Sequence, residues 1–182
     1  MNPLSAYEHP VGAYAFHNTH KENTASIQEH GIKATEQPGL NTRDADTALA
    51  DLGYDNPFPF DRTNVTYCHV NYEYIADRHD PKTDTVPLDE DVTIVIDTTK
   101  TTAPMYIADM GHISDLLDYH YVGSRIMIQS DTPDEAIEQY RNSITPVETP
   151  DDIATQLTSD ISHAELIIDG DIPSAAIVDI VR

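Results

Sequence analysis

Three side chains in this sequence are of types that could do chemistry together: a histidine and a threonine near the start and a glutamate near the end. His17 and Thr19 stand two positions apart within the run 14–19, Tyr-Ala-Phe-His-Asn-Thr. In an extended strand, residues two apart lie on the same face, so we expect these two side chains to share a side. An imidazole and a hydroxyl presented together can hydrogen-bond the edge of a sugar.

The late glutamate, Glu165, lies in the apolar run 164–168, Ala-Glu-Leu-Ile-Ile, which is typical of a buried strand. Burying an unpaired carboxylate costs several kcal/mol, so a carboxylate here needs a partner or a chemical role. The alternative is an edge-strand glutamate that points to solvent. Strand alternation alone does not separate the two.

A short helix is expected directly after the first strand. It begins at Asn23, whose side chain can accept from the first free backbone N–H groups, and it turns Ile27 inward. Gly31 then ends the helix as a C-terminal cap. The expected local structure is a strand that presents His17 and Thr19 beside a two-turn helix.

This opening segment resembles a known family. The pattern aromatic-His-x-Thr, then Asn23, Ile27 and Gly31-Ile32, is similar to the opening of the ADP-ribosyltransferase fold, most closely to its DarT-type branch, which modifies DNA, and to related small prokaryotic transferases. A second resemblance lies in residues 164–168, followed by Ile172-Pro173 and the run 177–180. Family members carry their catalytic glutamate in a strand of this kind.

The resemblance implies a role for each of several residues. His17 and Thr19 would hold the adenosine-side ribose of NAD, and Glu165 would grip the 2′-hydroxyl of the nicotinamide ribose. That carboxylate would stabilise the oxocarbenium-like charge that develops as the N-glycosidic bond breaks. Tyr67 would stack on the nicotinamide ring, although a buried structural tyrosine is the alternative.

Three further expectations concern the same site. Asn23 would contact the same part of NAD, although helix capping explains it equally well. Arg43 is the basic residue in the segment after the first helix and could bind the pyrophosphate of NAD or act in catalysis. The segment 34–62 is a candidate lid over the NAD site, and a plain surface connection with two packed phenylalanines is the alternative.

The composition is strongly acidic. Asp and Glu number 32 against 10 Lys and Arg, which gives a formal net charge of −22, and there is no Trp. Abundant Asp and Thr with scarce Lys are typical of proteins that work in concentrated salt, where self-repulsion is screened within about 3 Å. We therefore expect a haloarchaeal or halophilic-virus origin, with an acidic protein from an ordinary cytoplasm as the alternative.

The same composition bears on partners and location. No basic stripe is present for a phosphate backbone, which argues against stable nucleic-acid binding. The basic cluster of the DarT branch is replaced here by Asp44, Asp46 and Asp51, which puts DNA as acceptor in doubt. The single Cys68 cannot form an internal disulfide. Without a leader or membrane segment, a cytoplasmic or virion-associated protein is expected.

The rest of the chain predicts a single α+β domain over residues 1–182. We expect two small, mostly antiparallel sheets packed on each other with flanking short helices, the ADP-ribosyltransferase-like arrangement. Two capping signals open helices, Thr132 with Glu135 and Thr149 with Asp152. Further strands are expected at 64–74, 92–97, 105–109, 126–128 and 175–181, and further helices at 44–52 and 115–121.

The functional hypothesis is an NAD-dependent mono-ADP-ribosyltransferase that acts on a protein or nucleic-acid acceptor, as a toxin or virus–host effector. An NAD glycohydrolase, with water as acceptor, would use the same Glu165. The alternative from another class is a non-catalytic module of the same fold, for example a virion component that binds another virion or host protein. No metal is expected, because His17 and His20 would point apart on a strand.

Overall fold

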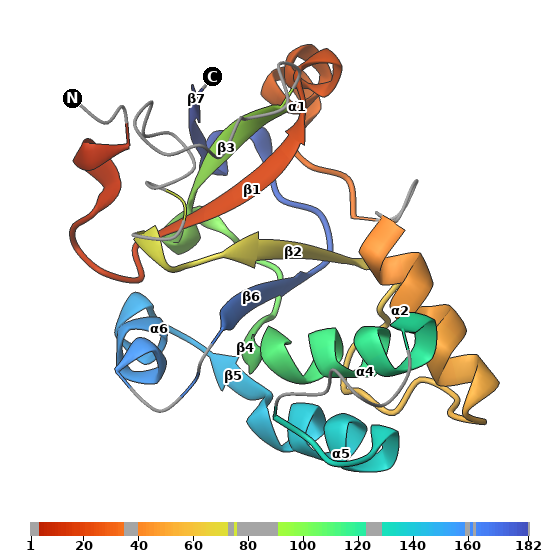
Figure 1. The fold of residues 1–182 in the computed structure, drawn as a ribbon. Coiled ribbons are helices and arrows are strands. Elements are labelled where there is room, and N and C mark those ends of the chain that lie inside the picture. The colour runs from red at the N-terminus through yellow and green to blue at the C-terminus, as the bar shows by residue number, and fades with distance from the viewer. Residues whose placement is uncertain are drawn as a thin grey trace, which may run out of the picture.

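The sheet forms the centre of the molecule (Figure 1). The computed structural model describes residues 4–34, 40–72, 75, 91–122, 129–158, 161 and 163–181, with the backbone alone at 40–44, 91 and 121–122. The strands are β1 Tyr14–His20, β2 Val65–His69, β3 Asp91–Asp97, β4 Met105–Asp109, β5 Thr145–Val147, β6 Ala164–Asp169 and β7 Ile177–Val181. Their order is β5-β4-β6-β2-β1-β3-β7, and every pair of neighbours is antiparallel.

Helices cover both faces of this sheet. They are α1 Thr24–His30, α2 Leu40–Asp51, α4 Met110–Val122, α5 Pro133–Ser143 and α6 Pro150–Leu157, with short 3₁₀ turns at Ser5–Tyr7, Lys21–Asn23, Thr98–Lys100 and Ser174–Ala176. The α+β class predicted from the sequence is confirmed. The strands form one seven-stranded sheet rather than the expected two. No helix in the described ranges is both long and apolar enough to cross a bilayer.

The sheet is nevertheless joined weakly at its middle. Strands β1 and β2 are paired through a single residue pair, Phe16 with His69, whereas β1 and β3 are paired along seven positions. The strands therefore separate beyond that pair. In Figure 1, β1, β3 and β7 form an upper group and β2, β6, β4 and β5 a lower one.

The core follows this division. One face carries a continuous apolar cluster under α1 and α6, in which Ile27 and Ile153 pack against strand residues such as Ile94 and Leu166. The opposite face carries two separate clusters. One lies under α2, α4 and α5 around Tyr140 and Ile167, and the other lies around Phe16 and Leu4. The break between them falls at the β1–β2 seam.

Both predicted capping signals are confirmed. The hydroxyl of Thr132 accepts from the backbone N–H of Glu135 at 3.2 Å and so begins α5. At α6, the carboxylate of Asp152 accepts from the backbone N–H of Thr149 at 2.8 Å. Acid in the first turn also suits the positive end of the helix dipole.

Several predicted boundaries are wrong. Helix α4 begins at Met110 rather than 115, and the hydroxyl of Ser114 contacts the Met110 carbonyl inside the helix. Gly111 lies within this helix, where the Gln129 side chain occupies the space that a Cβ would need. The first helix after β1 has no side-chain cap from Asn23. Strand β5 was not predicted, and the expected strand 126–128 lies outside the described residues.

The candidate lid contains well-packed structure. Residues 40–51 form α2, and Phe58, Phe60 and Arg62 are buried against the cluster around Tyr140. Residues 35–39 lie outside the described part. The described part of 34–62 therefore contributes to the core, as the alternative of a connection with two packed phenylalanines expects.

The end of α1 offers a test of this packing. Gly31 has φ +76 and ψ −170, a region restricted to glycine, and a Cβ there would lie 2.0 Å from the Ile172 carbonyl oxygen, which accepts from the Ile32 N–H. Gly53 has φ +83 but open space around it. We expect Gly53→Ala to cost about 1 kcal/mol of unfolding free energy from backbone strain alone. Gly31→Ala should cost at least about 2 kcal/mol more, because the bridge must also shift.

The measurement is urea denaturation of both variants in molar NaCl. Equal losses for the two glycines would contradict the close contact between α1 and the segment before β7.

Candidate functional site

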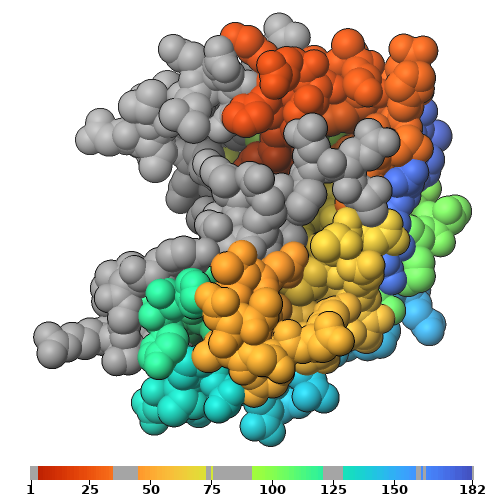
Figure 2. Space-filling model, turned by 90° about the vertical axis from the view of Figure 1, so that its right-hand side faces the viewer, coloured from red at the N-terminus to blue at the C-terminus, as the bar shows by residue number. Residues whose placement is uncertain are grey.

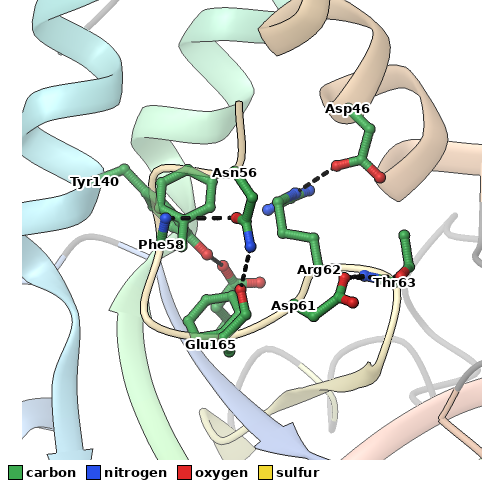
Figure 3. Close-up of polar contacts among 9 residues, drawn as sticks. Asp46, Asn56, Phe58, Asp61, Arg62, Thr63, Tyr140 and Glu165 are labelled. Atoms are coloured by element: carbon green, nitrogen blue, oxygen red, sulfur yellow. Dashed lines mark hydrogen bonds and ion pairs between the residues drawn. The ribbon is translucent and has the colours of Figure 1, made fainter. Parts of the chain in front are cut away.

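Glu165 lies in the middle of the sheet on strand β6, opposite His69 of β2 and Ala108 of β4. Its side chain is 6% exposed, which rules out the solvent-facing alternative. The Tyr140 hydroxyl, from α5, donates a hydrogen bond of 2.7 Å to the Glu165 Oε1 (Figure 3). The strand thus places a carboxyl group in the apolar layer between sheet and helices, held by one hydroxyl.

The protonation of this carboxyl group is unusual. Burial raises the pKa of Glu165 from 4.5 to about 7, and the negative Asp109 adds to the rise. The Tyr140 hydrogen bond and the charge of Arg62 oppose the rise without cancelling it. A carboxyl group of this kind exchanges its proton near neutral pH, as an acid or base catalyst must.

Arg62 reaches the site from the loop before β2. Asn56 holds this loop closed, since its amide donates to the Phe60 carbonyl at 2.7 Å and its side-chain oxygen faces the Phe58 N–H at 3.4 Å. Asp61 accepts from both the backbone N–H and the hydroxyl of Thr63, which fixes the turn into the strand. Figure 3 shows these contacts wrapping the loop around Glu165.

The guanidinium of Arg62 is itself buried, with 6% of the side chain exposed. Its Nε donates to Asp46 of α2 at 2.7 Å, and its Cζ lies 5.6 Å from the ring centre of Phe58 and 5.5 Å from that of Tyr67. A cation over two aromatic faces is stabilised by their quadrupoles. Arg62 is thereby fixed as a positive group beside Tyr67 and near Glu165.

Tyr67 supplies an unsatisfied polar group. It lies on β2, on the same face as Glu165, since its register partner Ile167 is two residues from that glutamate. Its hydroxyl is buried and has no hydrogen-bond partner among the described residues. Burial is also the main reason that its pKa is above the usual range. A buried hydroxyl without a partner is costly, and a bound ligand could satisfy it.

The early residues form a second group. His17 Nδ1 lies 3.0 Å from the Tyr67 backbone carbonyl, so Nδ1 carries the proton and Nε2 is left as an acceptor. Burial lowers the pKa of His17, against the effect of that hydrogen bond, which favours the neutral ring. The Asn23 amide donates to the Thr19 hydroxyl at 2.9 Å. His17 and Thr19 share a strand face, and Asn23 is tied to Thr19.

The sheet does not place the two groups on a common face. Across the Phe16–His69 pair, Glu165 is on the face of Phe16, whereas His17, one residue along and paired with Ile94, is on the opposite face. Strand alternation therefore places His17 and Glu165, which the resemblance assigns to one NAD site, on opposite faces of the sheet. The two groups meet only at Tyr67, whose carbonyl contacts His17 and whose ring lies beside Arg62.

Two members of the site were missed by sequence reasoning. Neither Tyr140 nor Arg62 was among the expected site residues. Arg43, the basic residue expected in the site, lies in the first turns of α2, where the backbone alone is described. Arg62 follows a Phe-Pro-Phe run in a chain with few cations, and that position was the available signal.

The buried carboxyl group predicts a specific pH dependence of stability. Because the pKa of Glu165 rises on folding from 4.5 to about 7, its favourable contribution is complete below pH 4.5 and is lost as pH rises through 7. Each pKa unit corresponds to about 1.4 kcal/mol, so Glu165→Gln should gain up to roughly 3 kcal/mol of unfolding free energy relative to wild type between pH 4.5 and 8.

Chemical denaturation at a series of pH values, in molar salt, measures this difference. Glu148→Gln, at an exposed carboxylate, is the matched control and should show no such change. A flat difference between Glu165→Gln and wild type would show that the carboxyl group is not buried as described.

The Tyr140 hydroxyl predicts a second effect. Its hydrogen bond holds down the pKa of Glu165, so Tyr140→Phe should raise that pKa further. The variant should lose about 1 to 3 kcal/mol of stability at pH 8, where the carboxylate is charged, and less at pH 5. Carboxyl carbon NMR shifts of Glu165 report the pKa directly. If the pKa of Glu165 were unchanged in Tyr140→Phe, the Tyr140 hydroxyl would not contact this carboxyl group.

No metal site was found, in that no cluster of three or more His, Cys, Asp or Glu side chains suited to a metal ion occurs in the described ranges. No protein-family model matches the chain, and no curated protein matches it either. The site as described consists of Glu165, Tyr140, Arg62 and Tyr67, with the His17 group on the far side of Tyr67.

Proposed function

We propose that this protein is an NAD-dependent mono-ADP-ribosyltransferase in which Glu165 is the catalytic carboxylate. The observation that carries the proposal is the state of this glutamate. It is buried in a central strand, has a pKa near neutral, and is held by one tyrosine hydroxyl beside a fixed cation. These features, together with the resemblance of residues 14–32 and 164–180, favour a chemical role over a packing role.

The neighbours of Glu165 suit the chemistry. Cleavage of the bond between ribose C1′ and the nicotinamide nitrogen releases neutral nicotinamide and leaves positive charge on the sugar. The Glu165 carboxylate would stabilise that charge and accept a hydrogen bond from the 2′-hydroxyl. When the acceptor attacks C1′, its proton would pass to the same carboxylate. The unpartnered Tyr67 hydroxyl would donate to an oxygen of the substrate.

The His17 group would bind the other end of the substrate. Because the Nδ1–H of His17 donates to the Tyr67 carbonyl, Nε2 can accept from a ribose hydroxyl. Thr19 and Asn23, which are hydrogen-bonded to each other, add further polar atoms beside it. The single-pair junction between β1 and β2 lies between this group and Glu165. The proposal therefore requires a dinucleotide to pass the point where these strands separate, with Tyr67 contacting both halves.

One observation favours the second candidate, a non-catalytic module of the same fold. His17 and Glu165 project from opposite faces, and Phe58 packs against Tyr140, the hydrogen-bond partner of the glutamate, with the buried Arg62 over its ring. In this reading, Glu165 and Tyr140 form a buried polar contact of the core. The two candidates differ in whether NAD binds and is cleaved.

The test is nicotinamide release from labelled NAD in molar salt, which reports bond cleavage whatever the acceptor is. We expect wild type and the exposed control Glu148→Gln to release nicotinamide. Glu165→Gln should lose at least about 100-fold in rate, as is usual when a group that stabilises transition-state charge is removed.

A thermal-shift measurement with NAD separates binding from chemistry. Glu165→Gln should still be stabilised by NAD if the His17 group binds the adenosine side, whereas His17→Ala should lose much of that shift. Absence of release and of any NAD-induced shift in wild type would support the module instead.

A further inference from the structure

A separate pocket of about 310 Å³ lies beside the ends of β1 and β2, away from Glu165. Residues 7–9, 11 and 12 line one side of it. In Figure 1, the segment that carries them loops beside those strand ends. Its lining is rich in aromatic rings, namely Tyr7, Tyr14, Phe16 and Tyr72, and it includes the carboxylate-bearing Glu8. Neither the sequence resemblance nor the proposed reaction gives this pocket a role.

The four aromatic rings come from three parts of the chain. Tyr14 and Phe16 are two residues apart on β1 and so lie side by side on one strand face. The Tyr7 ring meets Tyr14 edge to face, with centroids 5.2 Å apart and an interplanar angle of 73°. Tyr72 is tilted by 54° against Phe16 at 6.5 Å. Aromatic rings therefore border the pocket from the N-terminal segment, from β1 and from the residues after β2.

The charge around the pocket is negative. Glu8 is exposed in the lining, and its charge helps burial to raise the pKa of the Tyr72 phenol. On the same segment as Glu8, the Tyr7 hydroxyl donates to the Asp179 carboxylate at 2.8 Å, and burial together with that contact raises the pKa of Tyr7 to about 12. His9 also lines the pocket and lies 3.7 Å from Glu8. Both phenols thus stay neutral near carboxylates.

The wall is held rigidly. Leu4 is fully buried in the cluster around Phe16, and the Thr98 hydroxyl donates to the Gly12 carbonyl at 2.9 Å. Gly12 has φ +83, and a Cβ there would lie 2.2 Å from the Pro150 carbonyl oxygen, so the segment is pressed against the start of α6. A pocket already formed in the free protein loses little affinity to ordering.

We propose that this pocket binds an organic ammonium ion carrying methyl groups, whether a free quaternary amine or the methylated side chain of a lysine on a partner protein. Aromatic faces converging on a space with a carboxylate at its edge attract a weakly hydrated cation. A simple metal ion is a poor occupant, because its strongly held water would have to be exchanged for ring faces and few oxygen ligands. An anion would meet Glu8 and a chain of net charge −22.

Salt sharpens this selectivity. At molar ionic strength, charges more than about 3 Å apart are screened, so the acidic surface no longer attracts cations in general. Contact with desolvated ring faces persists, because it acts at van der Waals distance inside a pocket. Sodium at high concentration therefore should not displace a methylated ammonium ion.

The experiment is calorimetric titration of the full chain in 2 M NaCl at pH 8 with choline chloride and with 3,3-dimethylbutan-1-ol, a neutral molecule of the same shape. We expect saturable binding of choline, and binding of the alcohol at least 10-fold weaker, since the alcohol lacks the charge. Trimethyllysine and lysine peptides form a second pair. Preference for the methylated peptide over choline identifies a protein partner, and the reverse identifies a free amine.

Variants locate the site. Tyr72→Leu and Tyr14→Leu remove ring faces and should each weaken choline binding at least 5-fold, whereas Tyr72→Phe keeps the face and should retain it. Tyr54→Leu, whose hydroxyl contacts Asp134 in the helical layer, is the control and should bind choline as wild type does. A Tyr72→Leu chain that melts as wild type does confirms that folding is intact.

Three results would overturn the proposal. They are the absence of saturable choline binding up to 50 mM, equal binding of the neutral alcohol, and undiminished binding in both leucine variants. None of these results depends on NAD or on Glu165, so the outcome is independent of the proposed transferase activity.

Discussion

The pairing of Phe16 with His69 is the constraint on which the arrangement of this molecule depends, because among the described residues it is the one register pair between β1 and β2. Where two strands pair along their length, one apolar layer can run across both. Here the strands separate, and the layer on the Phe16 face divides into one cluster around Tyr140 and another around Phe16. The division leaves polar atoms at the junction, and His17 satisfies one of them, the Tyr67 carbonyl.

Burial raises the pKa of Glu165 to about 7, and the charge of Arg62 opposes that rise without cancelling it. A guanidinium paired directly with a buried carboxylate normally pulls its pKa well below the usual value. Arg62 instead donates to Asp46 at 2.7 Å and lies over the rings of Phe58 and Tyr67. It therefore acts on Glu165 by electrostatic attraction and not by a direct hydrogen bond. Asp46 thus keeps the cation from neutralising the site. Pairing Arg62 with Asp46 leaves the Glu165 carboxyl group with one hydroxyl partner, that of Tyr140. This arrangement adds nothing to the stability of the core.

The sequence predicted those features that depend on neighbours along the chain. The caps at Thr132 and Thr149, the glycine end of α1 and the strand that carries Glu165 all follow from residues within a few positions. The contact of Tyr140 with Glu165 spans 25 positions and needs the helix to fold over the sheet. No local pattern indicates which inward-facing residue of α5 will reach a given strand.

The error about His17 and Glu165 has a related cause. Side chains alternate along a strand, so a one-residue difference in register moves a side chain to the other face. Two distant strands can each be predicted correctly while the relation between their faces remains undetermined by either sequence. The single pair at Phe16 fixes that relation here. The expected pair of sheets failed similarly, because one residue pair is enough to make a continuous sheet.

The acidic surface gives both proposed sites a common physical basis. Of the few cations, Lys33 and Lys100 are paired with Asp171 and Asp97, and Arg62 is buried with Asp46, so these three basic groups serve the fold. In concentrated salt, electrostatic attraction is screened beyond about 3 Å, so recognition must come from groups in direct contact with the ligand. The buried carboxyl group of Glu165 and the aromatic pocket beside Glu8 would both meet that requirement, because each would contact its ligand directly and would not depend on net charge.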